Sequence, residues 1–264
     1  MAEGAIASLK RYAAQAWGVA AAEIQKLVHD PLELLTRAIQ PVLWLLLFGE
    51  VMVQVRGVSP GHVRYMDFLS AGILAQSCLF VAIFYGISAI WERDLGVLQR
   101  YLVSPAPRSA LVAGKAFSAG VRALSQAVIV YLLAFGLGVG ISFNPLHILT
   151  VLVAIVVGSA LFSTFSLIIA CIVKTRERFM GIGQVLTMPI FFASNAIYPL
   201  SLMPVWLRIV SRANPLTYEV DALRAMMLNG ESSAYGLACD FGVLVGVTCL
   251  FVAIASRLYG RMGY

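Results

Sequence analysis

Charged residues are scarce in this sequence, and their scarcity excludes an ordinary soluble domain. Only 12% of the 264 residues are charged and 60% are hydrophobic, whereas a soluble domain is about 25% charged and about 45–50% apolar. The chain has no Gly-X-Y repeat, and its long uncharged runs are untypical of disordered or coiled-coil proteins. The composition therefore predicts an all-α polytopic membrane protein.

Metal-binding and phosphate-binding patterns are also missing. The four cysteines form no CxxC pair and the three histidines lie far apart in the chain, so neither residue type has the spacing of a metal site. The string at residues 109–116 comes nearest to a phosphate-binding loop, but it lacks the leading Gly and the Ser or Thr after the Lys. We therefore expect no catalytic site, no metal and no bound cofactor, and we expect any ATP hydrolysis to take place in another chain.

Basic residues outnumber acidic ones, 19 against 13, but they form no run interleaved with aromatic residues. They gather between the apolar stretches, where anionic lipid headgroups are the expected counter-charge. We expect membrane lipids as partners and no nucleic acid.

Six uncharged stretches are long enough to cross a membrane, which takes about 20 apolar residues. Between the six spans, the Lys and Arg residues divide unevenly: the face with both termini receives 14 and the opposite face 5. Because cytoplasmic loops are enriched in Lys and Arg, both termini are predicted to be cytoplasmic. The expected domain covers residues 37–264, with spans at 37–55, 68–90, 117–141, 148–173, 179–200 and 235–256.

The first 36 residues predict a helix that lies along the membrane rather than across it. Apolar residues recur at steps of three and four, with Arg11 and Lys26 on the opposite side, which is the pattern of an amphipathic helix. Asp30-Pro31 disfavours its continuation. The segment 1–36 is expected to be an interfacial helix, and a soluble helix docked on another protein is the alternative.

Two connections between spans carry helical patterns of their own. Residues 91–108 begin helically and are stopped by two prolines, and Leu95, Leu98 and Leu102 fall on one face. This helix would dock in a groove of a soluble partner or lie at the membrane interface. Residues 201–234 predict two short helices, which either enter the outer leaflet or form a pair on the surface.

These two connections resemble the ABC-2 type transporter permeases, the membrane subunits of ABC exporters, especially the short daunorubicin-resistance and nodulation-factor kind. The family's cytoplasmic pattern is similar to Glu92-Arg93, Gly96, Leu98, Tyr101-Leu102, Ser104-Pro105 and Gly114-Lys115. Its outer pattern is similar to Tyr198-Pro199, Met203-Pro204, Trp206-Leu207, Asn214-Pro215-Leu216-Thr217-Tyr218, Asp221 and Arg224. The resemblance covers nearly the whole sequence.

The resemblance implies a half-transporter in the bacterial inner membrane. Two permease chains, as a homodimer or a heterodimer, would pair around a central pathway, and two soluble ABC nucleotide-binding subunits would hold ATP and Mg beneath them. Residues 92–104, with Leu95 and Arg100 among them, would form the coupling helix, and residues 201–229 would form the outer gate. The exported substrate would be amphipathic: lipid-like, glycan-lipid or drug-like.

Polar residues within the apolar spans are candidates for the substrate pathway, because hydrogen-bonding groups in an apolar wall suit an amphipathic ligand. Packing between helices is the alternative role for each of them. The five candidates are Gln76, Ser77, Gln184, Thr187 and Asn195.

Two other functions compete with ATP-driven export. An ion-coupled carrier would place carboxylates at mid-span or contain two broken-helix repeats, and an integral-membrane lipid enzyme would gather acids, His or Cys at one depth. The sequence pattern indicates neither arrangement. A membrane anchor without transport stays open.

The predicted topology can be tested by labelling single cysteines in a variant whose four native cysteines are replaced. Ser232→Cys lies in an expected outer connection and Arg176→Cys in an expected cytoplasmic one. A membrane-impermeant maleimide should label the first in intact cells and the second only after permeabilisation. The reverse pattern would contradict the assigned orientation.

Overall fold

The computed structural model describes residues 12–18, 20, 21, 25, 39–53, 64–99, 107–173 and 175–260. Every regular element in these ranges is a helix, and an isolated bridge pairs Ile141 with Leu228. The predicted all-α fold is therefore confirmed. Most of the predicted interfacial helix at residues 1–36 lies outside the described residues. Within this segment, residues 12–18 are described and are helical.

Within the described part of the chain, four helices are long and apolar enough to cross a membrane. They correspond to the second, third, fourth and sixth expected spans, although the third begins at residue 108 rather than at 117. They are α4 (Tyr65–Tyr85), which continues into α5 (Ile87–Asp94), α7 (Arg108–Gly136), α8 (Pro145–Ile172) and α12 (Leu237–Tyr259).

The helices at the first and fifth expected spans are shorter. Residues 39–52 form an apolar helix that includes η1 (Trp44–Gly49), a π-helical segment, and most of α3 (Glu50–Val53). α9 (Arg176–Phe192) contains Pro189 and ends before the predicted limit at residue 200. A proline inside a helix removes a backbone donor and crowds the preceding turn. That these two helices also cross the membrane, which would make six spans, stays a prediction.

Two Asn-Pro dipeptides determine where helices begin. Asn144 Oδ1 accepts a hydrogen bond from the backbone N–H of Leu146 at 3.0 Å, and Pro145 is the first residue of α8. A polar cap followed by proline is a favourable helix start, since proline's missing N–H has no helical partner there. The same arrangement, with Asn214 as the cap, begins α11 (Pro215–Met227). The shorter elements before α12 are η2 (Leu200–Leu202), α10 (Val205–Ala213) and α11 (Pro215–Met227).

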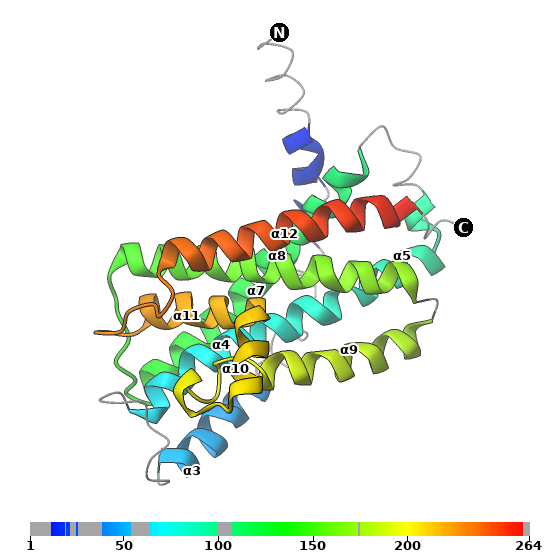
Figure 1. Ribbon diagram of the computed structural model, residues 1–264. Coiled ribbons are helices and arrows are strands. Elements are labelled where there is room, and N and C mark those ends of the chain that lie inside the picture. The colour runs from blue at the N-terminus through cyan, green and yellow to red at the C-terminus, as the bar shows by residue number, and fades with distance from the viewer. Residues whose placement is uncertain are drawn as a thin grey trace.

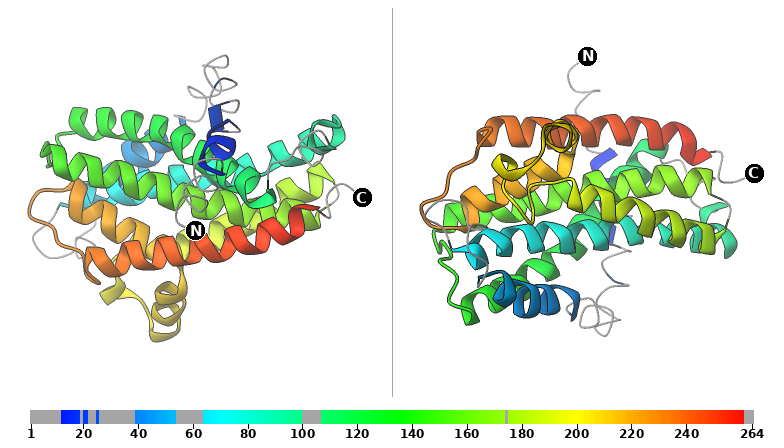
Figure 2. Two further views of the ribbon diagram at one scale, coloured as in Figure 1. Left: turned by 90° about the horizontal axis from the view of Figure 1, so that it is seen from above. Right: turned by 60° about the horizontal axis from the view of Figure 1, so that its bottom comes forward.

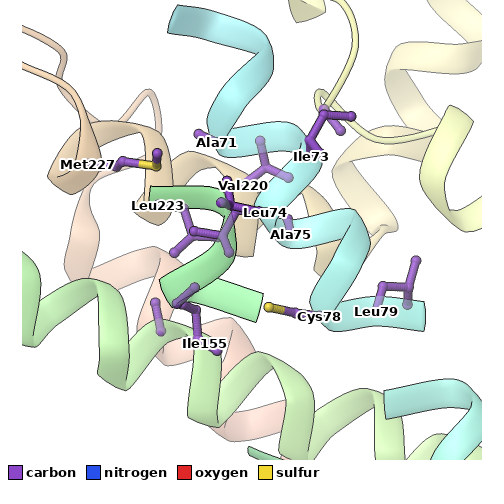
Figure 3. Close-up of a cluster of buried hydrophobic side chains, with 14 of the residues drawn as sticks. Ala71, Ile73, Leu74, Ala75, Cys78, Leu79, Ile155, Val220, Leu223 and Met227 are labelled. Atoms are coloured by element: carbon purple, nitrogen blue, oxygen red, sulfur yellow. The ribbon is translucent and has the colours of Figure 1, made fainter. Parts of the chain in front are cut away.

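The long helices lie side by side, as Figure 1 shows. α5, the turn from α8 to α9 and the end of α12 lie at one end of the bundle, and α11 lies toward the other. α11 packs against α4, α8 and α12 (Figure 2). Figure 3 shows Val220 and Leu223 of α11 in the hydrophobic core with Leu74 of α4 and Ile155 of α8.

α4 is central in the bundle and α12 is peripheral. In the most apolar 18-residue stretch of Tyr65–Asp94, 78% is buried inside the bundle. In the corresponding stretch of α12, only 11% is buried. Large apolar side chains such as Leu132, Leu149 and Leu250 are exposed on the outer faces of α7, α8 and α12. Exposed apolar surface of this extent is typical of a membrane or protein interface.

Gly72 allows α4 to approach the segment that follows α9. A Cβ atom at Gly72 would lie 2.1 Å from the carbonyl oxygen of Ala196, so an added side chain must push the two backbones apart. We expect Gly72→Ala to destabilise the folded chain by about 1–3 kcal/mol, the usual cost of overpacking. Thermal unfolding in detergent would measure the effect. Gly246→Ala is the control, because the Cβ position there is open, and equal unfolding temperatures for both variants would contradict the close packing.

Candidate coupling segment and outer gate

The candidate coupling segment begins as a continuation of α4. The chain turns after Asp94 at Gly96, whose φ of +71° favours glycine, and residues 97–99 are helical again. The turn separates Leu95, which is exposed, from Leu98, which is buried. The prediction that these two leucines share one helical face was therefore wrong. The other predicted coupling residues, Arg100, Tyr101, Leu102, Ser104 and Pro105, lie outside the described residues.

A buried ion pair joins the coupling segment to α7. Lys115 Nζ lies 2.7 Å from Glu92 Oε2 and donates to Oε1 at 2.9 Å, and the two side chains are 1% and 7% exposed. Each buried charge is tolerated because the other neutralises it. The hydroxyl of Tyr85 lies 2.9 Å from Ser118 Oγ beside this pair. The acidic and the lysine-containing parts of the cytoplasmic pattern thus meet in one contact.

A second contact joins the coupling segment to α9. Asp94 pairs with Arg93 at 3.1 Å and with Arg176 at 2.8 Å, and the Arg176 guanidinium stacks 3.5 Å from the centre of the Trp91 ring. Desolvation alone would raise the pKa of Asp94, but the hydrogen bonds and charges of the two arginines hold that pKa below its ordinary value. Asp94 is therefore ionised at neutral pH and ties α5 to the start of α9.

The candidate outer gate is built around the start of α11. Asn214 Oδ1 accepts from the backbone N–H of Leu216 at 3.0 Å, and Asn214 Nδ2 donates to the carbonyl of Ile190 at 2.7 Å. Pro215 is the first helical residue, and Leu216 is fully buried. One asparagine therefore caps α11 and ties it to α9.

Two further hydrogen bonds hold α11 against α10. The hydroxyls of Thr217 and Ser211 lie 3.0 Å apart, and both residues are fully buried. Tyr218 Oη donates to the carbonyl of Arg212 at 2.8 Å. The Asn-Pro-Leu-Thr-Tyr stretch thus acts mainly as a helix junction.

The two outer helices differ in burial. α10 starts after Pro204 and exposes Val205 and Trp206, at 73% and 66%, whereas α11 buries most of its residues in the bundle. Pro199 lies just before η2. α11 therefore packs inside the bundle while α10 lies on its surface, and the position of either helix relative to the outer leaflet stays a prediction.

Asp221 and Arg224 satisfy backbone groups around α11. Asp221 Oδ2 accepts hydrogen bonds from Ser233 Oγ at 3.0 Å and from the backbone N–H of Ala234 at 2.8 Å. Arg224 Nη2 donates to the carbonyl of Asn195 at 2.9 Å, and its guanidinium lies 3.7 Å from the centre of the Phe68 ring. These charged residues brace the connections on either side of the helix.

The candidate pathway residues occupy α4, α9 and the segment after α9. Gln76 is buried on α4, and Thr187 donates to the carbonyl of Gly183 at 2.5 Å within α9. Gln184 is exposed on α9. Asn195 is buried and accepts from Arg224 through its backbone.

Ser77 lines a cavity of about 280 Å³ between the first apolar helix, α4 and α7. Gln40 and Gln126 add two amide side chains to its wall, and Phe80 and Phe84 are among its apolar residues. Both amide atoms of Gln126 are buried, and neither has a hydrogen-bond partner among the described residues. This cavity offers unused hydrogen-bonding capacity in apolar surroundings.

Sequence reasoning missed three polar residues: Gln126, Arg176 as a partner of Asp94, and Glu219. The signal for Glu219 was an acid among the periodic apolar residues of α11. Arg176 and Gln126 gave no comparable signal, because a basic loop residue and a polar residue within a span are both common. Among the described residues, no three His, Cys, Asp or Glu side chains come together to hold a metal ion.

Comparison with known proteins places this arrangement in a family. The family described as ABC-2 type transporter matches residues 14–228. A protein named as transport permease ycf38 from Cyanophora paradoxa is 29% identical over 87% of this chain and 80% of its own length. The daunorubicin resistance ABC transporter permease protein DrrB1 of Streptomyces coeruleorubidus is 22% identical over 88% of this chain and 81% of its own.

A third relative is named after a different process. Nodulation protein J of Rhizobium leguminosarum bv. trifolii is 24% identical over 84% of this chain and 81% of its own length. The family match spans the coupling contacts at Glu92 and the whole of α11. The chain belongs to the ABC-2 type transporter family of transport permeases.

Proposed function

We propose that this chain is the membrane subunit of an ATP-driven ABC exporter that moves an amphipathic substrate out of the cytoplasm or the inner leaflet. A separate soluble ABC subunit would bind ATP and Mg, and a second permease copy, identical or different, would complete the pathway. The chain would lie in the bacterial inner membrane with both termini in the cytoplasm. The observation that carries this proposal is the junction at Glu92.

The Glu92 junction is suited to receive movement from a soluble partner. The ion pair with Lys115 links the coupling segment to α7, and Asp94 links the same segment to α9 through Arg176. Displacing α5 would therefore pull on two other helices through short charged contacts. The exposed Leu95, next to this junction, provides an apolar contact for a groove in the ATPase.

Two features support an amphipathic substrate. The cavity at Ser77 combines the unpartnered amide of Gln126 with aromatic neighbours, which suits a ligand with both polar and apolar parts. A separate groove of about 430 Å³ between α7 and α8 is lined almost wholly by apolar residues, with Phe135 and Phe143 among them. An acyl chain or another apolar group would fit such a groove in lipid.

Gentle purification of the tagged chain tests the function directly. We expect a soluble Walker-type ATPase to co-purify near equal stoichiometry, and its hydrolysis rate to rise when the complex is reconstituted into lipid vesicles with an amphipathic substrate. A chain that purifies alone and transports without ATP would refute the proposal and favour an ion-coupled carrier.

The buried ion pair predicts a charge-swap result. Lys115→Met breaks a buried ion pair by removing one partner, a change that usually costs about 3–5 kcal/mol, and we expect it to abolish ATPase stimulation. The double variant Glu92→Lys with Lys115→Glu restores an opposite-charge pair and should recover much of the stimulation. ATPase assays of the reconstituted complexes would measure both effects.

Arg178→Met is the matched control, because Arg178 is an exposed cation on α9. It should retain full stimulation. If the swap variant stays as inactive as Lys115→Met while remaining folded by size-exclusion chromatography, the ion pair is not the coupling contact.

A further inference from the structure

Glu219 is a fully buried carboxyl group without a hydrogen-bond partner. It is the fifth residue of α11, its side chain is 0% exposed, and neither carboxyl oxygen meets a donor in the described part of the chain. The pathway and coupling residues do not account for it. Burying an ionisable group in this way costs free energy, so the residue is a candidate for a functional role.

The carboxyl group fits into a space that a glycine of α8 leaves open. A Cβ atom at Gly158 would lie 2.2 Å from Glu219 Cδ and 2.4 Å from each carboxyl oxygen. Because no side chain could share that space, the two positions are complementary in size. The carboxyl is therefore seated against the backbone of α8 when α11 occupies the bundle.

No cation among the described residues faces this carboxyl. The Cys78 thiol on α4 interacts with it electrostatically and lies beside Ser159 of α8, and Figure 3 shows Cys78 in the core that α11 enters. The charged or titratable groups nearest the ends of the packed helices have other partners. Asp67 pairs with Arg64, His147 meets Ser142, Arg224 donates to Asn195, and Asp221 and Asp240 share the one hydroxyl proton of Ser233.

An ionised carboxylate in this position would be uncompensated. Even after the protein relaxes, an unpaired buried charge costs several kcal/mol, whereas a protonated acid avoids most of that cost. The seated form of α11 therefore requires a neutral carboxylic acid. Once water reaches the group, the acid can transfer its proton to water and the resulting carboxylate is solvated.

We propose that Glu219 is a proton-binding site that links the seating of α11 to pH. The proton stays on the carboxyl while α11 packs against Gly158, and it is released to water when α11 leaves α8. Rising pH consequently favours the unseated helix. The link to transport rests on the proposed exporter function and on the outer gate expected at residues 201–229, which include α11, but proton binding itself does not.

Infrared spectroscopy tests the protonation without an ATPase. The full chain in lipid nanodiscs should show the carbonyl stretch of a protonated carboxylic acid at neutral pH. Glu219→Gln should remove this band, and Glu177→Gln, which changes an exposed acid at the start of α9, should leave it. Absence of the band, or its persistence in Glu219→Gln, would overturn the proposal. Should Glu219→Gln fail to fold, Glu219→Asp keeps an acid at the site and should shift the band's frequency.

Hydrogen exchange tests the link to α11. Above the ordinary titration range of an exposed glutamate, each pH unit should raise the unseated population about tenfold, in addition to the intrinsic rise in exchange that every amide shows. The α11 amides should therefore show a steeper pH dependence than the α8 amides of the same sample, and Glu219→Gln should remove the difference. Equal slopes in the wild-type chain would refute the linkage.

These two experiments, taken with the purification described above, separate the proton site from the exporter function. A chain that shows the protonated band and the steeper α11 slope but recruits no ATPase would retain the proton site and lose the exporter function. A chain that recruits and stimulates an ATPase but lacks the band would retain the exporter function and lose the proton site.

Discussion

A helix that ends inside the bundle must find partners there for the backbone groups of both its ends, since lipid offers none. α11 meets this constraint at its start through Asn214, which caps the helix. At its other end the carbonyl of Met227 accepts from the N–H of Ser142 at 2.8 Å, and the N–H of Asn229 donates to the carbonyl of Gly140 at 3.0 Å. The connection between α7 and α8 is thereby fixed to α11.

The packing of α11 inside the bundle also explains why the helices next to it carry small residues where they meet it. α8 carries Gly158 where the Glu219 carboxyl lies, and α4 carries Ala71 and Ala75 within the cluster that includes Val220. Small residues at helix contacts allow close approach in membrane proteins, where packing rather than the exclusion of water holds helices together. Larger side chains on α4 or α8 would push α11 away from these two helices.

Local features of this chain were predictable from sequence, and contacts between distant segments were not. The Asn214-Pro215 dipeptide marks a helix start by cap chemistry alone. Pro189 within an apolar run does not interrupt the hydropathy pattern, so the predicted fifth span ran past Phe192. The burial of Glu219 and Lys115 could not be predicted from the sequence, because only tertiary packing buries them.

Movement at the coupling segment can reach α11 through α8, which takes part in both hydrophobic clusters. At one end Leu167 and Ala170 pack with Ile90 of α5, and farther along Ile155 packs in the cluster that contains Leu223 of α11. α8 has 28 residues without a break, so at 1.5 Å per residue it spans about 42 Å. A straight helix of that length transmits a shift at one end to the other with little loss, provided its own hydrogen bonds stay intact. In the proposed exporter, the candidate coupling segment and the candidate outer gate therefore need no contact with each other to act together.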